Sequence, residues 1–94
     1  MATDLSSVAI PHSEDIASVA SAEVVTFDGG RVSMIRAYID DAGGGTVIIG
    51  SGDAVQVAGQ TWDTIWIAPR SPIIGTTTIS ITPGTTADVE LRLY

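Results

Sequence analysis

The feature that most constrains this fold is a two-residue alternation of apolar and polar side chains near the end of the chain. In residues 87–94, Val89, Leu91 and Leu93 alternate with charged or polar neighbours. Successive side chains of a β-strand point to opposite faces, whereas a helix repeats every 3.6 residues. The segment is therefore predicted to be a strand with one buried and one exposed face.

Similar short runs, rich in Val, Ile and Thr, recur through residues 22–94 and are separated by clusters of Gly, Pro and Asp. The predicted strands are residues 22–27, 31–40, 46–49, 54–58, 61–68, 73–82 and 87–94. Turn signals at intervals of about 8–12 residues, without a helical period, are typical of sandwiches and barrels. We predict an all-β fold, either an antiparallel β-sandwich or a jelly-roll-like barrel of about 7–8 strands.

Two of these segments allow finer predictions. In residues 31–40 both faces of the strand are largely apolar, so this strand should be central or covered on both sides. In residues 73–82 we expect Ile79 and Ile81 to point inward, with the threonines between them pointing outward.

The first 21 residues follow a different pattern, and 94 residues allow only one domain. Residues 5–10 resemble a short strand stopped by Pro11, and Ser13 is a candidate N-cap for a short helix through Ala20. We favour an extended N-terminal arm or edge strand over residues 1–21, followed by one sandwich domain over residues 22–94. A basic segment followed by an apolar run is absent, so we expect neither a signal peptide nor a membrane span.

Residues suited to catalysis are scarce. The chain has no cysteine and a single histidine, His12. A nucleophilic triad would combine His12 with Ser13 or Ser7 and with Asp15, but such triads are usually assembled from distant segments. We interpret His12 as a solvated loop histidine, and we do not expect an enzyme or a bound cofactor.

Three aspartates lie next to glycine-rich turns. Asp40 and Asp41 precede three glycines that we interpret as a flexible connection, and Asp53 ends the segment Gly-Ser-Gly-Asp. Converging loops of this kind can hold Ca²⁺, but turn aspartates commonly bond to their own backbone instead. We favour the second interpretation and predict no metal site. Neither glycine cluster has the lysine and following helix of a phosphate loop.

Two tryptophans form the most informative pair. Trp62 and Trp66 lie four residues apart in a predicted strand, so they share one face at a spacing of about 13–14 Å. We favour the interpretation that they belong to the core or to a subunit interface. The alternative is that they form a platform on which sugar rings stack. The second interpretation predicts a carbohydrate-binding module that uses Trp62, Trp66 and the neighbouring Asp63.

The charge balance excludes some partners and favours others. The chain has 4 Lys+Arg against 11 Asp+Glu, a net charge of −7, and no lysine. Such a chain is unsuited to nucleic acid, because binding depends on cations that neutralise phosphates. Lysine commonly protects an exposed strand edge from pairing with another chain, and this chain lacks that protection. We therefore expect a homo-oligomer, trimeric or higher, whose contacts come from the arm and the apolar residues Leu5, Val8, Ile10, Ile73 and Ile74.

The cysteine-free chain rich in Thr, Gly and Val, with its N-terminal arm and the ending at residues 79–94, resembles small virion structural proteins of tailed bacteriophages. Decoration (cement) proteins and small head–tail or fibre-base proteins are the types it resembles most. The resemblance is one of style over residues 22–94 and implies a non-enzymatic part that binds the major capsid or tail protein. The acidic charge then suits the exterior of the virion better than a position against packaged DNA.

Overall fold

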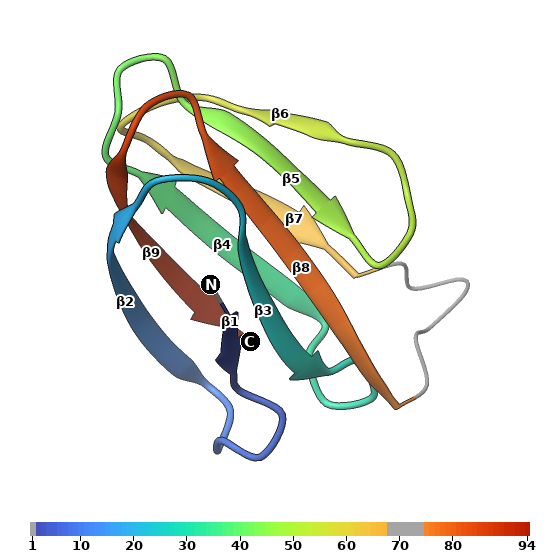
Figure 1. Cartoon of the computed structure of the whole chain (residues 1–94). Coiled ribbons are helices and arrows are strands. Elements are labelled where there is room, and N and C mark those ends of the chain that lie inside the picture. The colour runs from blue at the N-terminus through green and yellow to red at the C-terminus, as the bar shows by residue number, and fades with distance from the viewer. Residues whose placement is uncertain (1, 68–74) are drawn as a thin grey trace.

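The computed structural model describes residues 2–67 and 75–94, which form two β-sheets packed face to face (Figure 1). No helix occurs in these two ranges. The described strands are β1 (Ala2–Asp4), β2 (His12–Val19), β3 (Glu23–Asp28), β4 (Met34–Ile39), β5 (Gly45–Ile49), β6 (Val55–Val57), β7 (Trp62–Trp66), β8 (Thr76–Pro83) and β9 (Ala87–Leu93). The predicted all-β sandwich is confirmed, and the two sheets do not close into a barrel.

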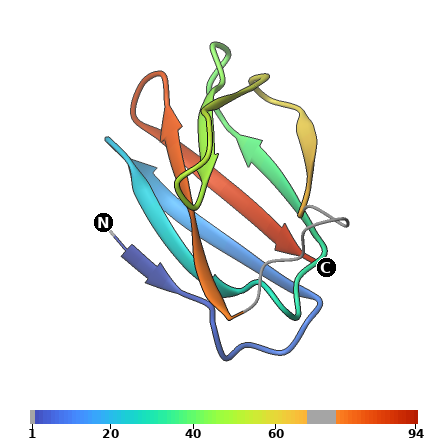
Figure 2. The ribbon, with the colours of Figure 1, turned by 90° about the vertical axis from the view of Figure 1, so that its right-hand side faces the viewer.

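The strands lie in the order β1-β3-β8-β5-β6 in one sheet and β2-β9-β4-β7 in the other. Every neighbouring pair is antiparallel except β1 and β3, which run parallel. The strand β4 lies between β9 and β7, so its predicted central position is confirmed. The two ends of the chain belong to different sheets and lie on opposite sides of the sandwich (Figure 2).

The core is built from the inward faces of both sheets. The predicted inward residues Ile79 and Ile81 of β8 are fully buried, as are Leu91 and Leu93 of β9. Further core residues from β3, β4 and β5 include Val25, Phe27, Ile35, Ile39 and Val47. Because burial of apolar surface is the main favourable term in folding, this alternation determines which face of each strand points inward.

The N-terminal 21 residues contribute one edge strand to each sheet. β1 pairs with β3, and β2 pairs with β9, placing Ile16 opposite Val89. Leu5, Ile16 and Val19 belong to the core. The helix considered for residues 13–20 is absent, since hydrogen bonding to β9 and the inward position of Ile16 favour a strand. Residues 5–10, which resemble a strand in the sequence, lie outside the strands and connect β1 to β2.

The glycine directly before β5, Gly44, is packed tightly, which contradicts the expected flexible connection. Gly44 is buried at a positive φ of 65°, and a Cβ there would lie 2.0 Å from the carbonyl oxygen of Val57. A Cβ on Gly59 would lie 1.9 Å from the carbonyl oxygen of Asp41. Two backbone segments therefore pass each other here at a distance that only glycine permits.

Candidate functional site

The outer face of the four-stranded sheet combines aromatic and cationic side chains. Its members come from β4, β7 and β9, and we call this set the tryptophan–arginine face: Met34, Arg36, Tyr38, Trp62, Trp66 and Arg92. The register places Tyr38 opposite Trp62, and Met34 opposite Trp66. On the other side of β4, the register with β9 places Arg36 opposite Arg92. These residues are neighbours because three strands distant in sequence meet in one sheet.

Trp62 is held between charged and aromatic neighbours. The Cζ atom of Arg92 lies 4.4 Å from the centre of the Trp62 ring, and that of Arg36 lies 5.6 Å away. The Tyr38 ring packs against Trp62 with centroids 5.4 Å apart and an interplanar angle of 48°. Two arginines directly opposite each other repel. The electron-rich face of the indole offsets part of that repulsion and fixes both guanidinium groups.

Trp66 is the most exposed large apolar side chain in the described ranges, with 68% of its surface accessible. It shares the outer face with Trp62, as the spacing predicted, and it is not part of the core. Asp63 points to the other side of β7, and its Oδ2 accepts a hydrogen bond of 2.8 Å from the Ala58 N–H. The sheet therefore brings the two tryptophans together on one face and leaves Asp63 out.

A shallow acidic groove lies beside Tyr38 on the same outer face. Its volume is about 280 Å³ and its lining includes four carboxylates: Asp15, Asp40, Asp88 and Glu90. The register places Asp15 and Tyr38 on either side of Glu90. The outer face is thus acidic toward β2 and aromatic and cationic toward β7.

The aspartates considered for Ca²⁺ do not form a common cluster, and the hydrogen bonds of Asp40 and Asp41 are made with side chains far along the chain, not with their own backbone as expected. Asp40 accepts a hydrogen bond from Gln60, and Asp41 accepts one of 2.7 Å from the Thr85 hydroxyl. Asp41 precedes β5 and Asp53 follows it, so these two lie toward opposite ends of that strand. Within the described part of the chain, no three His, Asp or Glu side chains are placed to hold a metal ion together.

His12 is the first residue of β2, and the expected loop position is wrong. Its Nε2 lies 2.9 Å from Oε1 of Glu14, two residues along the same face of the strand. Ser13 and Asp15 alternate with these residues and point to the opposite face, so they do not form a triad with His12. Ser7 lies exposed in the segment between β1 and β2.

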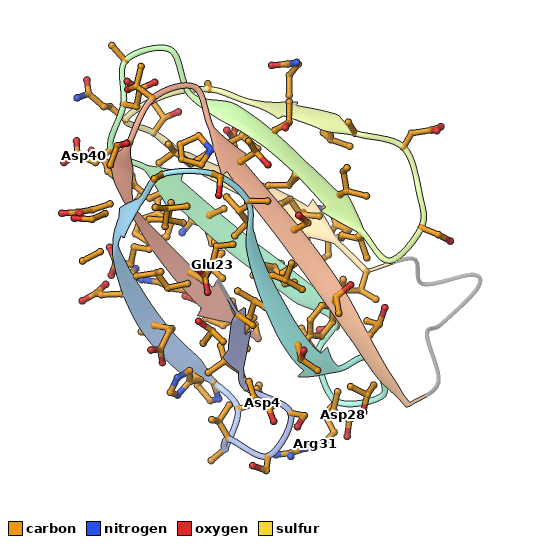
Figure 3. The ribbon with its side chains drawn as sticks, in the orientation of Figure 1. Asp4, Glu23, Asp28, Arg31 and Asp40 are labelled. Carbon is orange, nitrogen blue, oxygen red and sulfur yellow. The ribbon has the colours of Figure 1, made fainter. Side chains whose placement is uncertain are left out.

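Sequence analysis missed one buried acid. Glu23 is 1% exposed, and its side chain points between the two sheets (Figure 3). The Thr3 hydroxyl donates a hydrogen bond of 2.7 Å to Oε2, while Oε1 has no partner among the described residues. Glu23 lies two residues before Val25 and four before Phe27, so it shares their buried face, and this spacing was the signal that could have identified it.

The residues expected to make assembly contacts have different environments. Leu5 is in the core and is unavailable to a partner, and its N–H donates to the Thr26 carbonyl, which continues the pairing of β1 with β3. Val8 and Ile10 are partly buried and pack against that core. Ile73 and Ile74 lie outside the described residues. The large apolar side chains exposed in the described ranges are instead Val55, Trp66 and Tyr94.

No protein-family model, curated protein or solved structure matches the chain. The described residues contain no helix long and apolar enough to cross a membrane. The inference of function therefore depends on the sandwich and on the chemistry of its exposed face.

Proposed function

We propose that this chain is a non-enzymatic structural protein of a larger assembly that binds a protein partner through the tryptophan–arginine face. The observation that carries this proposal is the exposure of Trp66 beside Trp62, Tyr38 and two arginines. Trp, Tyr and Arg are the residue types that dominate binding energy at protein–protein interfaces. A partner covering Trp66 would remove the largest apolar side chain of this face from water.

The specific assembly that we propose is a phage virion, in which the chain acts as a decoration or cement protein on the capsid lattice. The support comes from the resemblance of residues 22–94 to small virion proteins and from the net charge of −7. An acidic subunit is better suited to the outside of a virion than to contact with packaged DNA. A major capsid or tail protein would then be the partner.

The alternative is a carbohydrate-binding module that uses Trp62 and Trp66. Their shared outer face favours it. Stacking of a sugar needs a free ring face, however, and the Trp62 ring is already in contact with Arg92 and Tyr38. Only Trp66 offers a largely uncovered ring, which favours a protein partner over an extended glycan.

Two measurements test this function. In the first, mass spectrometry of phage particles purified from the strain that encodes the chain should detect it, and protease added outside intact particles should remove it. Absence of the chain from those particles would contradict the virion proposal.

In the second, the wild type and the Trp66→Ala variant are applied to a glycan array, with Thr78→Ala on the other sheet as the control. We expect no glycan binding by any of the three proteins. Glycan binding that is lost only in Trp66→Ala would support the carbohydrate-binding alternative.

A further inference from the structure

Among the described residues, β7 forms an edge of the four-stranded sheet, with β4 on one side and no strand paired on the other. The Ile67 N–H donates to the carbonyl of Ser33, the residue directly before β4. The pairs Ile35–Ile65 and Ala37–Asp63 continue this register, so the backbone groups of Asp63 and Ile65 point toward β4. In an antiparallel ladder, alternate residues direct their backbone groups to one side. The N–H and C=O groups of Trp62, Thr64 and Trp66 therefore point toward the open edge.

This edge has fewer protective features than the other edge of the same sheet. β2 follows Pro11, carries the inward-pointing pair His12 and Glu14, and has a register shift between Ile16 and Val19. Prolines, inward charges and bulges all hinder the pairing of an edge with another chain. β7 has five residues, no proline and no register shift. Its single inward charge, Asp63, is held by a hydrogen bond from the Ala58 N–H.

We propose that β7 pairs antiparallel with β7 of a second copy of this chain, about a two-fold axis at Thr64. The inference rests on the proposed function and deepens it by naming a second copy as a partner. The pairing places Trp62 opposite Trp66 of the second copy, and Thr64 opposite its own equivalent. Each of these three opposed pairs forms two hydrogen bonds, so every backbone group directed to the open edge is satisfied.

The outward side chains of β7 suit this symmetry. They read Trp-Thr-Trp in either direction along the strand. A shift by one residue would oppose backbone groups that point the wrong way. A shift by two would remove both Trp62–Trp66 pairs, because one tryptophan of each copy would then face Thr64 and the other would lie beyond the paired strand. The self-complementary surface that a two-fold interface requires is therefore present in one five-residue strand.

The charge distribution also permits the pairing. Each chain carries a net charge of −7, which opposes association in general. The acidic groove with Asp15, Asp88 and Glu90 lies over β2 and β9, away from the open edge. On this face, β7 itself carries the uncharged Thr64, and its neighbour on β4 is Arg36. The paired edges thus meet where carboxylates are fewest on this face.

The contact area sets the expected affinity. A tryptophan can bury about 150–250 Å². The four tryptophans of the pair, together with two short strands, fall below the roughly 1,200–2,000 Å² of a stable standard interface. We therefore expect a dissociation constant of about 1–100 μM, with the pair populated at high local concentration on an assembly.

Because the natural chain has no cysteine, a single introduced thiol tests the register. Directly opposed, hydrogen-bonded residues have Cα atoms about 5.5 Å apart, within the range that a disulfide spans. Thr64→Cys at 100 μM, oxidised with diamide, should form a covalent dimer in a non-reducing gel. Gln56→Cys, also exposed but on β6, is the matched control and should form at least about fivefold less. Equal cross-linking of the two variants would overturn the proposal.

Sedimentation of the chain at 5–200 μM provides the second test. The wild type should show a monomer–dimer equilibrium, and Thr64→Lys, which adds a charge at an exposed edge position, should weaken it at least about tenfold. A melting curve close to that of the wild type would show that Thr64→Lys is folded. A wild type that remains monomeric at 200 μM overturns the strand pairing, while detection of the chain on virions would still support the proposed function.

Discussion

The two outer faces of this sandwich differ sharply in chemistry. The outer face of the five-stranded sheet carries small hydroxyl and aliphatic side chains: Val24, Thr26, Ile48, Thr78, Ser80 and Thr82. The outer face of the four-stranded sheet carries both tryptophans, two arginines and the acidic groove. Both faces cover the same core, so the core does not explain the difference. Only the outer face of the four-stranded sheet thus offers the aromatic and cationic side chains on which the proposed contact depends.

The largest expected effect comes from a change in the core between the faces. Leu91→Ala should lower the free energy of unfolding by about 2–5 kcal/mol, because it leaves a cavity at a fully buried position. Urea denaturation monitored by tryptophan fluorescence measures this loss. A loss below about 1 kcal/mol would mean that the two faces do not depend on a common core.

A smaller effect should distinguish the faces themselves. Trp62→Ala should cost about 1–2 kcal/mol, because it removes the ring contacts and leaves Arg36 and Arg92 facing each other. Thr78→Ala on the other face should change stability by only about 0.5 kcal/mol.

Salt provides the control for this second prediction. Screening weakens repulsion between exposed charges, so part of the loss in Trp62→Ala should be recovered when ionic strength rises. Urea denaturation at low and high salt measures it. If Thr78→Ala costs as much as Trp62→Ala, or if the loss does not respond to salt, the contrast between the faces is contradicted.

The smallest effect is electrostatic and lies at the edge of the five-stranded sheet. The side-chain hydrogen bond from Ser6, followed by the bond from its backbone N–H, lowers the pKa of Asp4 below its ordinary 3.8. Since the folded pKa is depressed, this contribution is complete above pH 3.8 and is lost as pH falls through the folded pKa.

An NMR titration of the Asp4 carboxyl checks this. Ser6→Ala should raise the Asp4 pKa toward 3.8, because it removes the larger of the two causes. Ser7→Ala, one residue along, should leave the titration unchanged. Identical curves for the wild type and Ser6→Ala would show that the hydroxyl does not act on Asp4.

The sequence predicted the strands whose two faces differ most. In β9, three apolar residues alternate with charged ones, so only one orientation buries the apolar set. β1 and β2 were harder to predict because their pairing depends on residues far along the chain, such as Val24 for Ala2 and Leu93 for His12. Local patterns carry no information about those partners.

The candidate site was predicted only in part. The spacing of Trp62 and Trp66 placed both on one face, but the other face of β7 also carries a large apolar residue, Ile65, beside Asp63. The pattern alone could not decide which of the two faces was the core. The contacts of Trp62 with Arg36 and Arg92 require the strand order β9-β4-β7, which has no signature in the sequence.

The close passage at Gly44 and Gly59 has a consequence for how the chain can vary. Neither glycine contributes a side chain to the tryptophan–arginine face, yet any side chain at either position would overlap a backbone carbonyl. Gly30 meets only the flexible carboxylate of Asp28, at 3.3 Å. Among functional descendants of this sequence in a random library, glycine should persist at residues 44 and 59 while residue 30 diversifies.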